Sequence, residues 1–142
     1  MKKILYSLLS IISIESIAQS QTEKTSIYVK DGVEIIISKQ DCIDKQKGIE
    51  KQLLVIELIN QNEYPVLLTF KKELWYDNIC TSCNSESHEH IVTQNIDANT
   101  NVLGGCSSSN KSLNVFVKML NLKDVRQLTN YEFKDIKIEK AK

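Results

Sequence analysis

Short runs of β-branched residues separated by polar turns constrain the fold of this chain most strongly. The runs recur about every ten residues with almost no helical periodicity, which is typical of β-sandwiches. One proline and four glycines leave no flexible linker. We expect an all-β, immunoglobulin-like sandwich of about seven or eight short antiparallel strands, with a small β-barrel as the alternative. The immunoglobulin-like order is favoured because hairpins alone would leave long apolar edges exposed.

The first half of the chain contains the clearest strands. Asp31-Gly32 lies between two β-branched runs and predicts a hairpin with a type I′ turn. Residues 51–60 are apolar on both faces, which predicts a central strand covered on both sides. Pro65 predicts the start of the next strand, over residues 66–76, because proline is tolerated where a strand begins.

The second half of the chain is less regular. Residues 90–96 predict a strand, and residues 97–112 predict a turn followed by a glycine- and serine-rich loop. Residues 113–120 alternate as a strand does, although their apolar residues also fit helical spacing. In residues 130–140 the apolar positions change parity at Lys134-Asp135, which predicts a β-bulge or a bend.

The N-terminal 18 residues have the pattern of a signal peptide. Lys2 and Lys3 precede an apolar run over residues 4–14, which is long enough for a signal peptide and too short to span a bilayer. We therefore expect an exported protein with no membrane span, located in the periplasm or secreted into the medium.

The cleavage site is expected between Ala18 and Gln19, with a cut after Ser20 as the alternative. The chain has no cysteine before Cys42, so a lipoprotein signal, which requires a cysteine directly after the cut, is excluded. Residues 19–142 are then expected to form a single domain.

The charge balance of the mature chain argues against a nucleic-acid binder. Without Lys2, Lys3 and Glu15 of the signal peptide, the 18 basic and 18 acidic residues become 16 and 17, a net charge of −1. A protein that binds nucleic acid needs a basic face, and this composition predicts a surface of mixed charge instead.

The four cysteines of an exported chain indicate two disulfides, because thiols oxidise outside the cytoplasm. Cys42, Cys80, Cys83 and Cys106 all lie at expected strand ends or in loops. The favoured pairing joins Cys80 and Cys83 outward, one to Cys42 and the other to Cys106. A local Cys80–Cys83 bond together with Cys42–Cys106 is the alternative.

The segment "CTSCNSESHEH", residues 80–90, is the main candidate for metal chemistry. Cys80, Cys83, His88 and His90 offer the ligand types of a zinc site, and the two histidines alone would suit copper. The spacing is unfavourable, because His88 and His90 would point to opposite faces of a strand. We therefore assign no metal ligand and expect exposed loop histidines, while a Zn- or Cu-binding protein or an enzyme using this loop remains the alternative.

Other chemistry finds little support in the sequence. No helix is indicated after Cys83, and Pro65 precedes the Cys-x-x-Cys, so a thioredoxin-like redox site is not expected. No catalytic serine motif occurs. Trp75 and Tyr76 offer stacking surface for a sugar or peptide, but a tryptophan at a strand end is expected to fill the core. We assign no catalytic or cofactor-binding residue and expect no cofactor.

Several short motifs are similar to those of small uncharacterised exported proteins of the Bacteroidota: "KDGVEI", "DCID", "WYDNICTSC", "GGC" and "NKSLNVF". This resemblance implies export, a β-sandwich and paired cysteines, and it carries no activity.

These observations favour a disulfide-stabilised β-sandwich that acts as a non-catalytic binding or interaction module rather than an enzyme. Its partner is expected to be a protein or glycan of the envelope or medium. An inhibitor or immunity-type protein that blocks its partner with an exposed loop is a further alternative.

Overall fold

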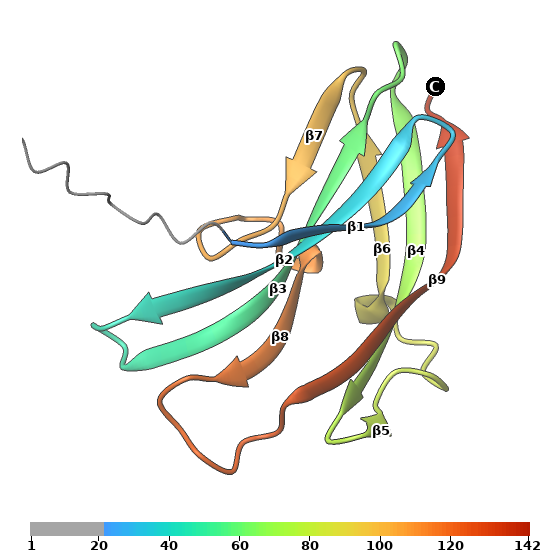
Figure 1. Ribbon diagram of the computed structural model, residues 1–142. Coiled ribbons are helices and arrows are strands. Elements are labelled where there is room, and N and C mark those ends of the chain that lie inside the picture. Colours follow the sequence, from blue (N-terminus) through green and yellow to red (C-terminus); the bar gives the residue numbers. More distant parts are fainter. Residues whose placement is uncertain (1–21) are drawn as a thin grey trace, which may run out of the picture.

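Residues 22–142 are described by a computed structural model, in which nine strands form two antiparallel sheets (Figure 1). The expected all-β sandwich is confirmed. Within this part of the chain the only helices are two short 3-10 turns, η1 (His88–His90) and η2 (Lys111–Leu113). The expected signal peptide, residues 1–18, and its cleavage site lie outside the described residues.

Five strands form the first sheet, sheet A. Its order is β1 (Lys24–Lys30), β2 (Val33–Asp44) and β3 (Ile49–Asn60), with β7 (Thr100–Leu103) and β8 (Asn114–Met119) on the second edge of β3. β7 pairs with the C-terminal half of β3 and β8 with its N-terminal half. β3 therefore has partners on both sides, as the sequence predicts for a central strand.

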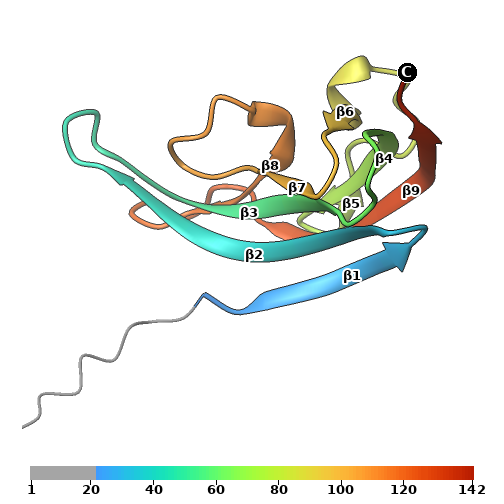
Figure 2. The same ribbon diagram turned by 90° about the horizontal axis from the view of Figure 1, so that it is seen from above.

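Four strands form the second sheet, sheet B. Its central strand is β4 (Val66–Tyr76), with β5 (Ile79–Cys80) and β6 (Ile91–Ile96) on one edge and β9 (Leu128–Lys140) on the other. The connections β3–β4, β6–β7 and β8–β9 each cross from one sheet to the other. The long β2–β3 hairpin extends well beyond the strands of sheet B (Figure 2).

The β1–β2 hairpin has the predicted turn. Asp31 and Gly32 have φ angles of 51° and 70°, and Lys30 pairs with Val33 directly across the turn. A type I′ turn needs positive φ at both central residues, which Asp tolerates and Gly adopts freely. A Cβ atom at position 32 would also clash with the side chain of Asn62, so both the backbone angle and the available space favour glycine there.

The core lies between the two sheets. The even-numbered residues of β4, from Val66 to Tyr76, are buried and face sheet A, while the odd-numbered residues are only half-buried. In β3 every residue from 53 to 58 is buried. The even ones join the core, and Leu53 and Val55 form a smaller cluster with Cys42 and Cys106. The predicted burial of this strand on both faces is thus confirmed.

The bulge predicted at the end of the chain is present in β9. Thr69 of β4 pairs with Lys137 and Lys71 pairs with Lys134, so β9 contains one residue more than β4 across this interval. Asp135 has a φ of 53° at this point. The bulge restores the inward direction for the apolar residues that follow, since Phe133 and Ile138 both pack against the core.

The strand predicted over residues 113–120 is present as β8, preceded by the last residue of η2. One element differs from the prediction: β7 lies where a turn and a loop were expected. Its exposed Thr and Asn residues give it no apolar alternation that would indicate a strand. Pairing with β3 is what makes this segment a strand.

No helix in residues 22–142 is both long enough and apolar enough to cross a membrane.

Candidate functional site

The Cys- and His-rich segment packs as a structural element along the edge of β4. Ser82 is fully buried; its Oγ accepts from the Leu74 amide at 2.8 Å and donates to the Lys72 carbonyl at 3.0 Å. The Thr81 amide donates to the Leu74 carbonyl at 2.9 Å. These bonds occupy the part of the β4 edge between β5 and β6, so the segment completes the sheet edge.

All four cysteines in the described chain form disulfides, as expected. The favoured outward pairing was wrong: Cys80 bonds to Cys83, and Cys42 bonds to Cys106. Cys42 and Cys106 share the small cluster formed with Leu53, whereas Cys80 and Cys83 lie on the opposite sheet. The two pairs are therefore separated by β3 and the core, which sequence spacing does not reveal.

The four residues considered as an alternative metal site, Cys80, Cys83, His88 and His90, do not form one in the described chain. Cys80 and Cys83 are consumed in their disulfide. His88 is exposed, and His90 lies with only 17% of its side chain exposed and its Nε2 3.4 Å from Glu89 Oε1. Within residues 22–142 no group of three or more His, Cys, Asp or Glu side chains is placed to hold a metal ion.

The expectation that Trp75 fills the core was wrong. Trp75 is an odd-numbered residue of β4, so its side chain lies on the outer face of sheet B and is only half-buried. Tyr76 takes the inward position instead, is 7% exposed and packs in the core. Burial raises the pKa of the Tyr76 hydroxyl, and nearby Arg126 opposes that rise. The two aromatic residues thus do not form one stacking surface.

One side of the sandwich is closed by hydrogen bonds between the sheets. We call this side, where β5 and β6 face β7 and β8, the closed seam. The Asn60 side-chain amide donates to the carbonyls of Ile96 at 3.2 Å and Asp97 at 3.1 Å. The Tyr76 hydroxyl donates to the Phe116 carbonyl at 2.7 Å. Each bond joins a strand of one sheet to a strand of the other sheet or, for Asp97, to the residue that follows that strand.

The opposite side, where β1 faces β9, has no such ties, and we call it the open seam. β1 pairs only with β2 and β9 only with β4. Among residues 22–142 no hydrogen bond or ion pair connects β1 with β9. Tyr28 and Ile27 of β1 line a small depression together with Tyr131 and Phe133 of β9, so only side chains fill this side.

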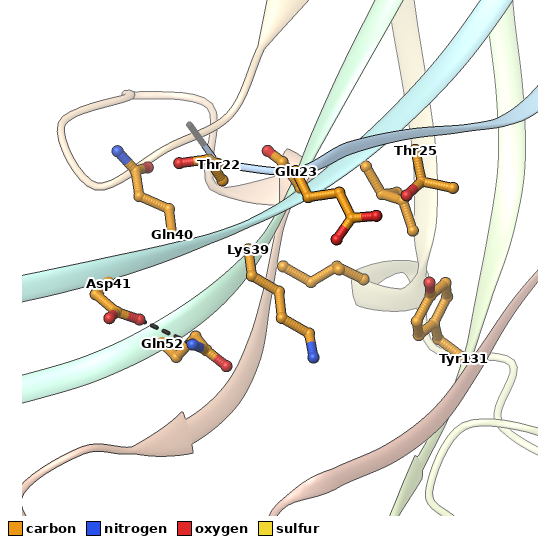
Figure 3. Close-up of a pocket in the computed structure, with 11 residues that line it drawn as sticks. Thr22, Glu23, Thr25, Lys39, Gln40, Asp41, Gln52 and Tyr131 are labelled. Carbon is orange, nitrogen blue, oxygen red and sulfur yellow. Dashed lines mark hydrogen bonds between the residues drawn. The ribbon is translucent and has the colours of Figure 1, made fainter. Parts of the chain in front are cut away.

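A groove of about 630 Å³ continues from this seam along the inner face of sheet A. Figure 3 shows Glu23 and Lys39 extending toward the space that Tyr131 borders from β9. The lining residues are Thr22, Glu23, Thr25, Ile37, Ser38, Lys39, Gln40, Asp41, Gln52, Leu54 and Tyr131. They come from β1 and the residues before it, and from β2, β3 and β9, so the folded sandwich is needed to assemble the groove.

The groove combines hydrogen-bonding groups with an aromatic ring. Lys39, Glu23 and Asp41 are exposed and charged, and Gln52 Nε2 donates to Asp41 Oδ1 at 2.9 Å. Burial raises the pKa of the Tyr131 hydroxyl, which therefore stays protonated and able to donate at neutral pH. The lining offers hydroxyl, amide, carboxylate and ammonium groups without His or Cys. Such a set is able to donate and accept hydrogen bonds with a polar ligand.

The backbone edges beside the groove are poorly suited to pairing with another strand. β1 has a register irregularity between Ser26 and Tyr28, and β9 carries the bulge at Asp135. Bulges and charged residues on edge strands are the devices by which sheets resist further strand addition. A ligand in the groove would therefore be held by side chains.

The groove residues were not identified from the sequence. Their one signal was the inward periodicity of β2, in which buried Val33, Ile35 and Ile37 are followed at the next inward position by exposed Lys39. An exposed lysine at an inward position shows that the inner face of β2 is no longer covered by sheet B from this residue onward. The sequence offered no way to know that Tyr131 would lie opposite.

Comparison with known proteins adds no relative. The chain matches no protein-family model, no curated protein and no solved structure. The functional assignment therefore depends on the geometry of this chain.

Proposed function

We propose that the protein is an exported, disulfide-stabilised, non-catalytic binding module that holds a polar protein or glycan partner in the groove beside the open seam. The observation that carries this proposal is the groove itself. It is large enough for a ligand, it lies where the sheets are not tied together, and its lining is polar with one aromatic ring. Binding sites commonly combine such concave shape with a few convergent polar groups.

Export is supported by two independent features. The two disulfides are bonds that persist in oxidising compartments outside the cytoplasm. The pattern of residues 1–18 is that of a signal peptide. We accordingly place the partner in the periplasm or in the medium.

Site-specific photo-crosslinking tests the proposal. A photoreactive phenylalanine analogue would replace Thr25, which lines the groove, or Glu34, which is half-buried on the outer face of sheet A. Each protein would be expressed in the producing cells and irradiated, and adducts from the envelope and the medium would be identified by mass.

We expect one dominant adduct from position 25 and none from position 34. An adduct at position 34 with none at position 25 would place the binding surface elsewhere and overturn the proposal. If the adduct is an enzyme or toxin whose activity falls on binding, the module acts as an inhibitor or immunity-type protein.

A further inference from the structure

Lys72 is a cation at a buried position on the inner face of sheet B. It occupies an inward position at the middle of β4, and the residue is only 5% exposed. Its ammonium donates to the Ser112 carbonyl at 2.8 Å, which is its only hydrogen bond to the described protein. No ion pair within residues 22–142 includes Lys72. Two of its three donor hydrogens therefore lack a protein acceptor.

A buried ammonium without a carboxylate partner is costly for a protein of this size. Desolvation disfavours the charged form, and burial lowers the pKa of Lys72, an effect that nearby Glu89 partly opposes. A buried charge without a compensating partner is destabilising. The ammonium would gain such a partner if it met an anion that the protein does not itself supply.

Lys72 borders a cavity of about 430 Å³ at the end of the closed seam. Arg126 also lines this cavity, with its guanidinium carbon 4.6 Å from the centre of the Tyr76 ring. The only acidic residue in the lining is Glu89, whose side chain is 75% exposed and lies beside His90. Lys72 and Arg126 together with Glu89 give the lining one positive charge in excess, which a single negative charge would balance.

The uncharged part of the lining is mixed, with Thr81, His90 and Asn114 as polar members and four apolar or aromatic side chains beside them. Leu74 and the Tyr76 ring contribute from β4, and Val115 and Phe116 from β8. The rings of Tyr76 and Phe116 are stacked with centroids 6.4 Å apart. An inorganic anion would leave these apolar side chains without contacts, whereas an organic acid would place its carboxylate on the cations and its carbon skeleton against the apolar side chains.

We propose that this cavity binds a small organic monocarboxylate, with the ammonium of Lys72 binding the carboxylate, Arg126 adding a second positive charge to the cavity, and Leu74, Val115 and the two aromatic rings packing against the apolar part of the ligand. The site is separate from the groove beside the open seam, because the two share no lining residue. The two proposals are therefore independent, and a result that contradicts one does not contradict the other.

Thermal unfolding with and without benzoate tests this site, with benzamide as the uncharged analogue and sulfate as the inorganic anion. We expect benzoate, at about 10 mM, to raise the Tm of the native protein, since a ligand that binds only the folded state stabilises it. Benzamide and sulfate should raise it less. Amide resonances of Tyr76, Asn114 and Phe116 should shift on benzoate titration in heteronuclear NMR spectra.

Three variants separate binding from structure. Lys72→Met should have a Tm equal to or above that of the native protein and should lose the response to benzoate. Arg126→Gln alters an exposed residue and should weaken benzoate binding at least about tenfold without unfolding the protein. Lys111→Met, at an exposed lysine beside Ser112 that does not line the cavity, is the matched control and should respond like the native protein.

Absence of a benzoate response in the native protein would overturn the proposal, as would an undiminished response in Lys72→Met. Equal responses to benzoate and benzamide would show that the negative charge is not recognised. Equal responses to benzoate and sulfate would show that the apolar side chains of the cavity do not contribute to binding. If Lys72→Met does not fold, the native NMR titration and Arg126→Gln decide between the same outcomes.

Discussion

The two sides of the sandwich differ in how the sheets are joined. On the closed seam, buried side chains such as Asn60 and Tyr76 cross from one sheet to carbonyl groups that belong to the other. On the open seam, β1 and β9 have no hydrogen bond between them within residues 22–142, and side chains border a groove. The same core thus lies between one side that holds the sheets together and one side that is available to a ligand.

This difference predicts that the two sides of the sandwich respond differently to substitution. Buried hydrogen bonds are costly to break because they leave unsatisfied polar groups, so the closed seam is expected to be sensitive to substitution. Polar groups on the open seam are already solvated and are expected to tolerate change. Stability and binding should therefore respond to different residues.

The largest expected effect on stability is loss of the Cys42–Cys106 disulfide. It closes a chain separation of 64 residues, and replacing both cysteines by serine should lower the free energy of unfolding by about 4 kcal/mol. The matched pair is Cys80 and Cys83, three residues apart, for which loop closure predicts about 2 kcal/mol. Urea unfolding of the two double variants measures both values, and equal losses would contradict the assigned connectivity.

Asn60→Ala should be the most damaging single change on the closed seam. Its amide group donates to three carbonyls, those of Tyr64, Ile96 and Asp97, and its Oδ1 accepts from the Asn62 amide. We expect a loss of about 3 kcal/mol in unfolding free energy, because several of these groups would be left unpaired. Asn130→Ala, at an exposed position of β9, should change stability by less than about 0.5 kcal/mol. Similar losses of unfolding free energy at both positions would contradict the expectation that the closed seam is more sensitive to substitution than the open seam.

Tyr76→Phe removes one hydroxyl from the closed seam. Its 2.7 Å bond to the Phe116 carbonyl would be lost, and we expect a decrease of about 1 kcal/mol in unfolding free energy. The matched change on the open seam is Tyr28→Phe in β1. The Tyr28 hydroxyl makes no hydrogen bond within the described chain. Chemical unfolding should show no more than about 0.5 kcal/mol for that variant.

The smallest expected effect concerns the attachment of β1 to its sheet. Glu57 accepts from Lys24 at 2.8 Å and from Asn101 at 2.8 Å, and these bonds lower the pKa of Glu57 despite its burial. A carboxylate with a lowered folded-state pKa adds stability above its unfolded pKa, and this contribution is lost as pH falls through the folded value. Because Lys24 is largely exposed, Glu57→Gln should cost less than about 1 kcal/mol at pH 7. Below the lowered pKa the two proteins should unfold alike, and a constant difference across pH would contradict this cause.

Local patterns in the sequence were sufficient for much of the fold. The Asp31-Gly32 turn, the doubly buried run of β3 and the parity shift before Ile136 each follow from a few neighbouring residues. Each corresponds to a backbone feature whose physical cause is local, namely positive φ, two-sided burial or an inserted residue. These predictions therefore required no knowledge of tertiary contacts.

The features that were missed depend on which segments meet in space. The disulfide pairing follows from the positions of Cys42 and Cys80 on different sheets. Trp75 lies outside the core because the register of β4 gives the inward position to Tyr76. The groove needs Lys39 and Tyr131 to face the same space, although they are far apart in the chain. The export and partner hypotheses stay predictions.

Binding isotherms of the crosslinked partner test the role of the open seam most directly. They would compare the native protein with Lys39→Glu in the groove and with Lys137→Glu, an exposed lysine of β9 outside it. Both changes reverse the same charge, so any difference between them reports position. We predict at least about a tenfold loss of affinity for Lys39→Glu, about 1.4 kcal/mol, with Lys137→Glu like the native protein. Equal affinities for all three proteins would contradict the assignment of binding to the open seam.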